Sequence, residues 1–334
     1  MDDIRIICGS IFQALAPVAP PTMSAMQINA FCTFMLIITL AAATGNILVI
    51  IVIAKFRTLR KQSNAHIASL ALADVLVAVI VIPLRMYENW NDSWNLPKWT
   101  CYLRNFFDGG LIGVSILSLC ALAADRYLSV CHPLTLMKVT RPVVVAATIA
   151  FCWVTPFLVW TVLLATGWHM TGLEIFEFCL MLTEVCVYVR NTANVCSTTV
   201  LSFVLPSFLI IFVYSKIFST ARRHARAVQD SNSTHEDAQK NSTFLRSTKA
   251  AVAPGIVVAV FFVCWLPYYL ALISDVINEH QLVPKLILQV LIWLGYLNSM
   301  MNPILYYIFS QDFKFAFKSL FRCNTSEMVM LEVR

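Results

Sequence analysis

Seven apolar stretches, each long enough to cross a lipid bilayer as a helix, dominate this sequence and limit what it can fold into. They lie near residues 29–54, 65–87, 101–130, 143–166, 194–219, 250–273 and 286–308. A spanning helix needs about 20 mostly apolar residues, whereas the strands of an outer-membrane barrel alternate apolar and polar residues over about 10 positions. The sequence therefore predicts an all-α membrane protein, folded as a bundle of seven transmembrane helices, and it excludes a water-soluble domain.

Composition and charge exclude some classes of function. The chain is 59% hydrophobic and 13% charged, against roughly 25% charged residues in soluble domains. Its net charge of +6 comes from basic residues in the loops between the apolar stretches, so membrane lipid is an expected partner and nucleic acid is not. The sequence contains neither carboxylates paired at one depth nor a glycine-rich phosphate loop, and we therefore do not expect an enzyme.

The polar segments divide the chain into three parts. We expect an extracellular tail over residues 1–28, the helical bundle over 29–310 and a cytoplasmic end over 311–334, with a flexible polar cytoplasmic loop at about 222–247. The cytoplasmic end opens with phenylalanine and leucine on one helical face and lysine on the other. This pattern predicts a short amphipathic helix that lies on the membrane surface.

Lysine and arginine residues indicate the orientation of the bundle. Lys55, Arg57, Arg60 and Lys61 crowd the first loop, while the second loop holds only Lys98. Because cytoplasmic loops carry the excess of basic residues, the amino terminus is predicted to be extracellular and the carboxyl terminus cytoplasmic. The chain is then expected to be a multi-pass protein of the plasma membrane.

Four cysteines lie on the extracellular side in this orientation. Cys101 opens the third span and Cys186 precedes the fifth, and a disulfide between them would persist in the oxidising space outside the cell. We predict this bond. Cys179 is left over on the same side and either pairs with Cys8 of the tail or stays a free thiol.

Two surface positions match modification signals. Asn91 begins the sequon Asn-Asp-Ser in an external loop and is expected to carry a glycan. Cys323 follows the amphipathic segment, beside basic residues, and is expected to be palmitoylated.

Asp108 is a carboxylate inside the third span, where an ionisable side chain costs about 2.5–3.5 kcal/mol on insertion scales and usually marks a functional site. It lies about two helical turns after Cys101, within reach of a ligand that enters from outside. A carboxylate there attracts a protonated amine through charge pairing at reduced dielectric. The alternative is an internal salt bridge, for which Arg85 of the second span is the candidate partner.

Aromatic and hydroxyl side chains on other spans complete a candidate ligand site around Asp108. They are Trp265, Tyr268, Tyr269, Trp293 and Tyr296, together with Thr198, Thr199 and Ser202. An aromatic cage suits a cation, and hydroxyl groups at its far wall suit a polar ligand. Taken singly, each aromatic is more often core filler and each hydroxyl more often bonds to its own helix. The prediction therefore depends on their combination with Asp108.

A second carboxylate, Asp74, lies near the middle of the second span. Four oxygen-bearing residues are expected at the same depth, namely Ser115, Asn298, Ser299 and Asn302. Such oxygen ligands around one carboxylate can hold a hydrated monovalent cation. A protonated Asp74 within a hydrogen-bond network is the alternative, and the residues alone leave both open.

These features together resemble the rhodopsin-like class of G-protein-coupled receptors. The matching motifs run in order through nearly the whole chain: Gly45-Asn46, Leu72-Ala73-Asp74, Asp125-Arg126-Tyr127, Trp153, Pro206 with Tyr214, Cys264-Trp265-Leu266-Pro267 and Asn302-Pro303-Ile304-Leu305-Tyr306. The resemblance implies a receptor that passes the binding of an extracellular ligand to a heterotrimeric G protein.

The resemblance also implies which residues change on activation. They are Asp125, Arg126, Tyr127, Tyr214, Tyr306, Ile116, Pro206 and Phe261. Arg126 would meet the G protein when the sixth helix swings outward, and Trp265 would relay ligand contact. An allosteric sodium ion at Asp74 is implied for the resting state, and no other cofactor is expected.

Within this class the chain is similar to the receptors for biogenic amines. Asp108 stands where those receptors carry the amine-binding aspartate, which implies a small protonated ligand of the histamine, serotonin or trace-amine kind. A non-amine or zwitterionic ligand is the alternative. Two other functions find less support, because an opsin needs a Schiff-base lysine where Tyr296 stands, and ion-coupled transporters usually show inverted repeats.

Three residues depart from the pattern of the class. Ser247 stands where many relatives carry the glutamate that pairs with Arg126, so we expect raised basal activity. Pro254 lies in the inner half of the sixth helix and is expected to loosen it. Arg85 is unusual beside an amine pocket, where it either pairs with Glu88 or selects a ligand that bears an acidic group.

Overall fold

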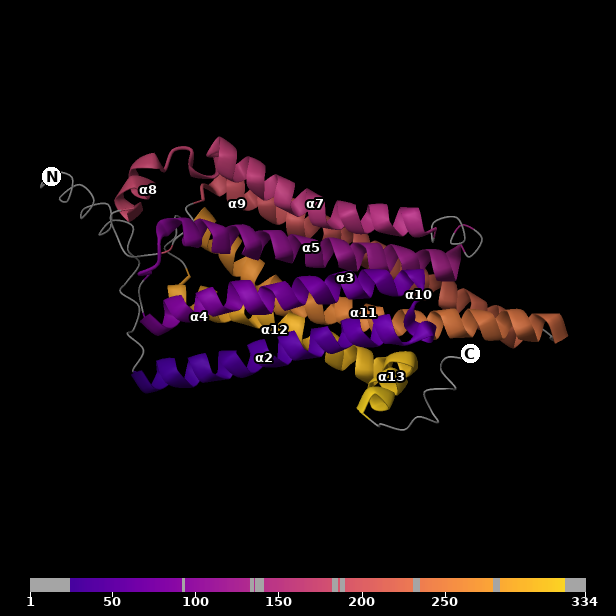
Figure 1. The fold of residues 1–334 in the computed structure, drawn as a ribbon. Coiled ribbons are helices and arrows are strands. Elements are labelled where there is room, and N and C mark those ends of the chain that lie inside the picture. The colour runs from indigo at the N-terminus through magenta and orange to yellow at the C-terminus, as the bar shows by residue number, and fades with distance from the viewer. Residues whose placement is uncertain are drawn as a thin grey trace, which may run out of the picture.

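The computed structural model describes residues 25–91, 94–132, 135, 141–181, 186, 190–230, 235–278 and 283–321. All regular structure in these ranges is helical, and the long helices run side by side as an elongated bundle (Figure 1). The predictions for Cys8, for Cys323 and for most of the tail over 1–28 lie outside the described residues.

Seven long helical segments follow the seven apolar stretches. In chain order they are α2 (Ala25–Lys55); α3 (Gln62–Leu76), which continues through η2 (Val77–Val81) into α4 (Ile82–Asn91); α5 (Lys98–Cys131); α7 (Pro142–Thr166); α9 (Thr192–Thr199), which continues through η4 (Val200–Val204) into α10 (Leu205–Asp230); α11 (His235–Ile277); and α12 (Lys285–Phe309). Both η2 and η4 are single wide turns of π-helix within otherwise α-helical spans. The fold is the predicted all-α seven-helix bundle.

Length and apolar composition identify membrane spans among the described helices. Six segments qualify on both counts, and the seventh helix, α12, has 25 residues and more polar positions. Three of those polar residues, Asn298, Ser299 and Asn302, are buried inside the bundle. The outer surface is apolar, with large side chains such as Phe208 and Leu158 more than half exposed. A surface of that kind is stable against lipid rather than against water.

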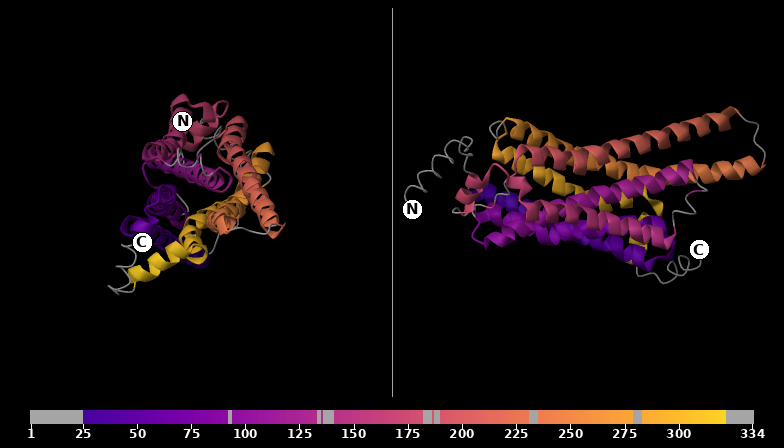
Figure 2. Two further views of the ribbon diagram at one scale, coloured as in Figure 1. Left: turned by 90° about the vertical axis from the view of Figure 1, so that its right-hand side faces the viewer. Right: turned by 90° about the horizontal axis from the view of Figure 1, so that it is seen from above.

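The cytoplasmic loop predicted at 222–247 is largely helical, which corrects that expectation. Helix α10 continues to Asp230 and α11 begins at His235, and both project beyond the other helices at one end of the bundle (Figure 2). The segment is polar, and a polar segment between two apolar spans predicts a loop. Arginine, alanine and glutamine are good helix formers, however, so a helix can continue past the membrane without apolar residues.

The bundle has two distinct ends. At one end α13 (Gln311–Phe321), the predicted amphipathic helix, turns away from the bundle axis (Figure 2). Its Phe313 stacks on Tyr306 with ring centroids 5.3 Å apart, and its Asp312 forms a salt bridge of 3.2 Å with Lys61. At the other end lie η3 (Trp168–Met170), α8 (Glu174–Met181) and the disulfide bond Cys101–Cys186. We call these the α13 end and the disulfide end.

Glycine residues let α5 approach α7 closely beside Asp108. A Cβ atom added at Gly110 would lie 2.4 Å from the ring of Phe157, and one at Gly113 would lie 2.6 Å from the Cβ of Pro156. Any larger residue would push the two helices apart. The Asp-Gly-Gly sequence at 108–110 therefore positions the charged face of α5 within the bundle.

Replacing Gly113 with valine should destabilise the protein, because its Cβ would overlap the rigid ring of Pro156. Overpacking costs about 1–3 kcal/mol, so the thermal midpoint of the detergent-solubilised protein should fall. Val162→Leu also enlarges a side chain, at an α7 position that is 50% exposed, and should leave the midpoint unchanged. Equal midpoints for Gly113→Val and the wild type would contradict this packing.

Candidate functional site

Three helices meet at Asp108, which is 5% exposed. Arg85 of α4 donates from Nη2 to Oδ2 of Asp108 at 2.7 Å. The hydroxyl group of Tyr296 on α12 lies 2.9 Å from both carboxylate oxygens and donates to them. The carboxylate is thus neutralised by a guanidinium and also held by a phenol, which satisfies a charge that would otherwise be costly inside the bundle.

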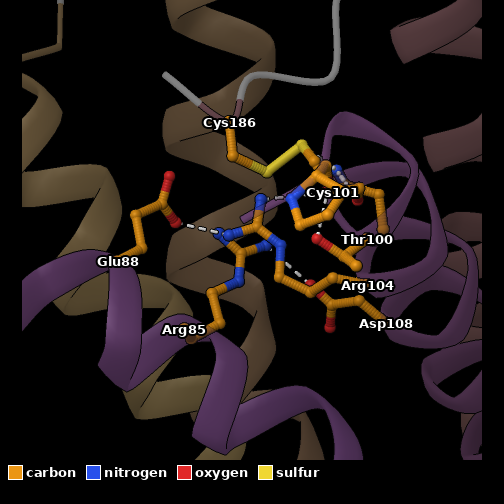
Figure 3. The surroundings of a disulfide bond; sticks show 9 residues. Arg85, Glu88, Thr100, Cys101, Arg104, Asp108 and Cys186 are labelled. Carbon is orange, nitrogen blue, oxygen red and sulfur yellow. Dashed lines mark hydrogen bonds and ion pairs between the residues drawn. A yellow bond between two sulfur atoms is a disulfide. The ribbon is translucent and has the colours of Figure 1, made fainter. Parts of the chain in front are cut away.

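A second ion pair lies beside the first, between Arg104 of α5 and Glu88 of α4 (Figure 3). The side chain of Arg104 is 2% exposed, and its guanidinium lies 5.2 Å from the centre of the Trp94 ring, a cation–π contact. The suggestion that Arg85 pairs with Glu88 is therefore wrong: Arg85 takes Asp108, and Arg104 takes Glu88.

Arg104 is a site residue that the sequence analysis missed. It precedes Asp108 by four positions in α5, so the two side chains share one helix face. Glu88 follows Arg85 by three positions in α4 for the same reason. This double spacing of opposite charges could have indicated that Arg104 belongs to the site, although it does not say which acid each arginine pairs with.

Aromatic residues predicted for the ligand site come together below these ion pairs. Trp265 packs edge-on against Tyr296 with ring centroids 6.2 Å apart, and Trp293 packs on Tyr296 at 5.4 Å. Tyr268 and Tyr269 neighbour Trp265 at 6.1 and 6.2 Å. All five predicted aromatics thus form one contiguous cluster that includes the hydroxyl partner of Asp108.

The predicted hydroxyl residues lie on α9 and η4, and η4 packs against α5. Thr198 donates to the carbonyl oxygen of Asn194 at 2.6 Å, and Ser202 donates to that of Thr198 at 2.6 Å. Thr199 is buried. The hydroxyl protons of Thr198 and Ser202 are therefore used within the helix, whereas their oxygen lone pairs can still accept a hydrogen bond.

Asp74 lies fully buried in the middle of the bundle, among the polar residues predicted for it. Ser299 donates to one carboxylate oxygen and Asn302 to the other, both at 2.7 Å. Ser115 and Asn298 are buried as well. The Oδ1 atoms of Asn298 and Asn302 are buried and accept no hydrogen bond from the described residues, so the donor set has oxygen lone pairs available for a hard cation.

The residues implied in activation lie from mid-bundle to the α13 end. Arg126 lies 3.4 Å from its neighbour Asp125, and the hydroxyl of Tyr127 contacts His132 at 3.2 Å. The hydroxyl groups of Tyr214 and Tyr306 are buried without a hydrogen-bond partner among the described residues. Both phenol groups therefore have donors and acceptors available for a partner at this position.

Three residues of the activation set belong to the bundle interior. Ile116 and Phe261 are both 1% exposed, and Phe261 neighbours Trp265 with ring centroids 6.4 Å apart. The carbonyl oxygen of Pro206 accepts a contact of 3.9 Å from the thiol of Cys120. These packing residues therefore continue the aromatic cluster toward the α13 end.

The predicted disulfide bond is confirmed, since Cys101 and Cys186 are joined with their Cα atoms 5.6 Å apart. Cys179 is buried and also disulfide-bonded, so the free-thiol alternative for it is wrong. The proposed partner Cys8 falls outside the described residues. Asn91 is the exposed last residue of α4, at the disulfide end.

Seven membrane helices around buried polar groups, closed at one end by a disulfide bond, have the architecture of a transmembrane receptor. The family model described as 7 transmembrane receptor (rhodopsin family) matches residues 45–306. The chain belongs to this family, whose members are signalling receptors of the plasma membrane and not enzymes.

Curated relatives cover most of the chain. This chain is 32% identical over 308 residues to 5-hydroxytryptamine receptor 4 of Cavia porcellus, and the alignment covers 87% of this chain and 79% of that protein. It is 32% identical over 317 residues to octopamine receptor beta-2R of Chilo suppressalis (86% and 78%). It is 33% identical over 280 residues to trace amine-associated receptor 7d of Mus musculus (83% and 78%).

Proposed function

We propose that this protein is a G-protein-coupled receptor for a small protonated amine. The observation that supports this most strongly is the position of Asp108. Its carboxylate is buried, accepts hydrogen bonds from the hydroxyl of Tyr296 on both oxygens, and adjoins the aromatic cluster. An ammonium group gains both charge pairing and cation–π contact in such surroundings. The relatives named for serotonin, octopamine and trace amines support the same ligand class.

We further propose that the disulfide end faces the outside of the cell and the α13 end faces the cytoplasm. Disulfide bonds persist in oxidising extracellular conditions, and the bond between Cys101 and Cys186 lies at this end of the bundle. Basic residues of the first loop, Lys61 among them, lie at the α13 end beside α13, as expected for the cytoplasmic side. Glycosylation of Asn91 and palmitoylation of Cys323 remain predictions that fit this orientation.

Ligand binding would reach the α13 end through packed side chains. Tyr296 contacts both Asp108 and Trp265, and Trp265 neighbours Phe261 deeper in the bundle. A ligand that moves Tyr296 or Trp265 would therefore repack the centre of α11. Outward movement of α11 would then open the α13 end so that the G protein can meet Arg126, and the buried hydroxyls of Tyr214 and Tyr306 could gain partners.

Replacing Asp108 with alanine should abolish the response to the amine. Loss of one partner of a buried ion pair costs about 3–5 kcal/mol, which corresponds to a fall in potency of at least about 100-fold. The measurement is a panel of histamine, serotonin, octopamine, tyramine and 2-phenylethylamine on cells that report cAMP and calcium. Asp312→Ala removes an exposed carboxylate at the α13 end and should respond normally. Full potency in Asp108→Ala at normal surface expression would refute the amine assignment.

We also propose that Asp74 binds a sodium ion in the resting state. Asp74 supplies the negative charge, and Ser115, Asn298, Ser299 and Asn302 supply neutral oxygens around it. The free Oδ1 atoms of the two asparagines favour this interpretation over a complete hydrogen-bond network, which would use them.

Exchange of sodium chloride for N-methylglucamine chloride should raise agonist affinity in the wild type by about 5-fold or more, the usual lower range for coupled sites. Sodium stabilises the resting state, so its removal shifts the population toward the state that binds agonist. In Asp74→Asn the two salts should give equal affinity in agonist competition binding. Sodium sensitivity that survives this substitution would place the ion elsewhere.

The serine at position 247 should raise activity in the absence of ligand. It carries no charge to pair with Arg126, whose only described ion pair is the contact with Asp125 on its own helix. Ser247→Glu should therefore lower ligand-free cAMP or calcium signalling toward the level of mock-transfected cells, whereas Ser247→Gln, of similar size, should lower it less. Equal signalling in wild-type and mock-transfected cells at confirmed surface expression would contradict this expectation.

A further inference from the structure

Two basic and two acidic side chains gather beneath the Cys101–Cys186 disulfide (Figure 3). We call Arg85, Glu88, Arg104 and Asp108 the charge cluster. Its two ion pairs, Arg85–Asp108 and Arg104–Glu88, leave it with no net charge. Any ligand that enters must therefore be accommodated by a set of charges that is already balanced.

The two arginines of the charge cluster are held very differently. Arg104 is 2% exposed, lies over Trp94 and approaches the amide oxygen of Asn105 in addition to Glu88. Arg85 is 21% exposed and makes one hydrogen bond, from Nη2 to Asp108. Arg104 is thus fixed in place by its packing, whereas Arg85 is the side chain that can move.

Arg85 also has donors that its partner does not use. A guanidinium offers five N–H groups in a planar fork that suits a carboxylate held through two parallel hydrogen bonds. Only Nη2 contacts Asp108, and the Nε atom of Arg85 is buried without an acceptor among the described residues. The Nε atom of Arg104 has no acceptor among these residues either, but Arg104 is 2% exposed and Arg85 is 21% exposed, so Arg85 is the guanidinium that a ligand can reach.

A ligand with a positive charge alone would unbalance the charge cluster. Its ammonium would replace Arg85 at Asp108, and the displaced guanidinium would need another carboxylate. Glu88 is the nearest candidate on α4, but it already binds Arg104. A displaced Arg85 would then keep only the contact with water that its 21% exposure allows, so a ligand with a positive charge alone is disfavoured relative to one that also brings an anion.

We propose that the ligand is zwitterionic, with an ammonium group for Asp108 and an anionic group for Arg85. This inference rests on the proposed function, since it keeps the amine at Asp108 and adds a second anchoring residue. When the ligand separates Arg85 from Asp108, its own anionic group would pair with Arg85 and its ammonium with Asp108, so the charge cluster stays balanced. Because Arg85 and Asp108 touch at 2.7 Å, the two ligand charges should stand on the same or neighbouring carbon atoms, as in an amino acid.

Matched pairs of compounds that differ by one carboxylate test the proposal. The probes are tyrosine and tyramine, 5-hydroxytryptophan and serotonin, histidine and histamine, and phenylalanine and 2-phenylethylamine, applied in amino-acid-free buffer to cells that report cAMP and calcium. The readout is the ratio of potencies within a pair, which is insensitive to expression level. In the wild type, the amino acid of at least one pair should be more potent than its amine.

Substitution of Arg85 should reverse this preference. Arg85→Gln should lower the potency of the amino acid relative to its amine by about 10- to 100-fold, the effect of losing a hydrogen bond to a charged group. Arg85→Lys keeps the positive charge and should keep the direction of the preference. This matched variant separates a role of the charge from a general defect in folding, and surface labelling of each variant checks expression.

The outcomes distinguish the inference from the proposed function. If amines activate through Asp108 but every amine outperforms its amino acid, or if Arg85→Gln leaves the ratio unchanged, the zwitterion proposal is wrong and the amine receptor stands. If no compound of either kind activates the wild type, or if Asp108→Ala responds fully, both proposals fail. A wild-type preference for an amino acid that Arg85→Gln reverses and Arg85→Lys retains supports the proposal.

Discussion

A carboxylate inside a membrane bundle must find a partner, because an unpaired charge at low dielectric costs more than most single contacts can offset. Asp108 meets this requirement with a guanidinium from α4 and a phenol from α12. The requirement therefore joins three helices at the disulfide end, close to where α7 packs on the glycines of α5. In the proposed amine site an entering cation would therefore compete with Arg85, a partner that the protein itself supplies.

Asp74 satisfies the same requirement in another way. Its described hydrogen-bond partners are neutral, a serine hydroxyl and an asparagine amide from α12. Neutral donors stabilise a carboxylate but leave its charge in place, whereas the charge of Asp108 is already balanced by Arg85. A cation at Asp108 must therefore displace a partner, and a cation at Asp74 need not. The ligands that we propose for the two carboxylates differ for this reason: a small inorganic cation at Asp74 in mid-bundle and an organic ammonium at Asp108 near the disulfide end.

Much of the fold and part of the site could be predicted from the sequence. The seven spans followed from apolar length alone, and the buried set around Asp74 followed from polar residues at one depth. The helical extension of α10 to Asp230 did not, because outside the lipid a helix no longer needs apolar residues. The partner of Arg85 was also undetermined, because Asp108 and Glu88 are both within its reach and the choice depends on how α4 and α5 are rotated toward each other.

Helix α12 connects the two carboxylates physically. Tyr296, Ser299 and Asn302 recur at intervals of three residues, so they share one helix face, and they donate to Asp108, Asp74 and Asp74 in turn. A ligand that draws Tyr296 toward or away from α5 must therefore also shift the donors of Asp74. If the proposed ammonium and sodium sites are both occupied in turn, binding at one carboxylate would change the affinity at the other, and by linkage the effect would be equal in both directions. An agonist that weakens the proposed sodium site would then be opposed by sodium, and α12 alone would be sufficient to couple the two sites.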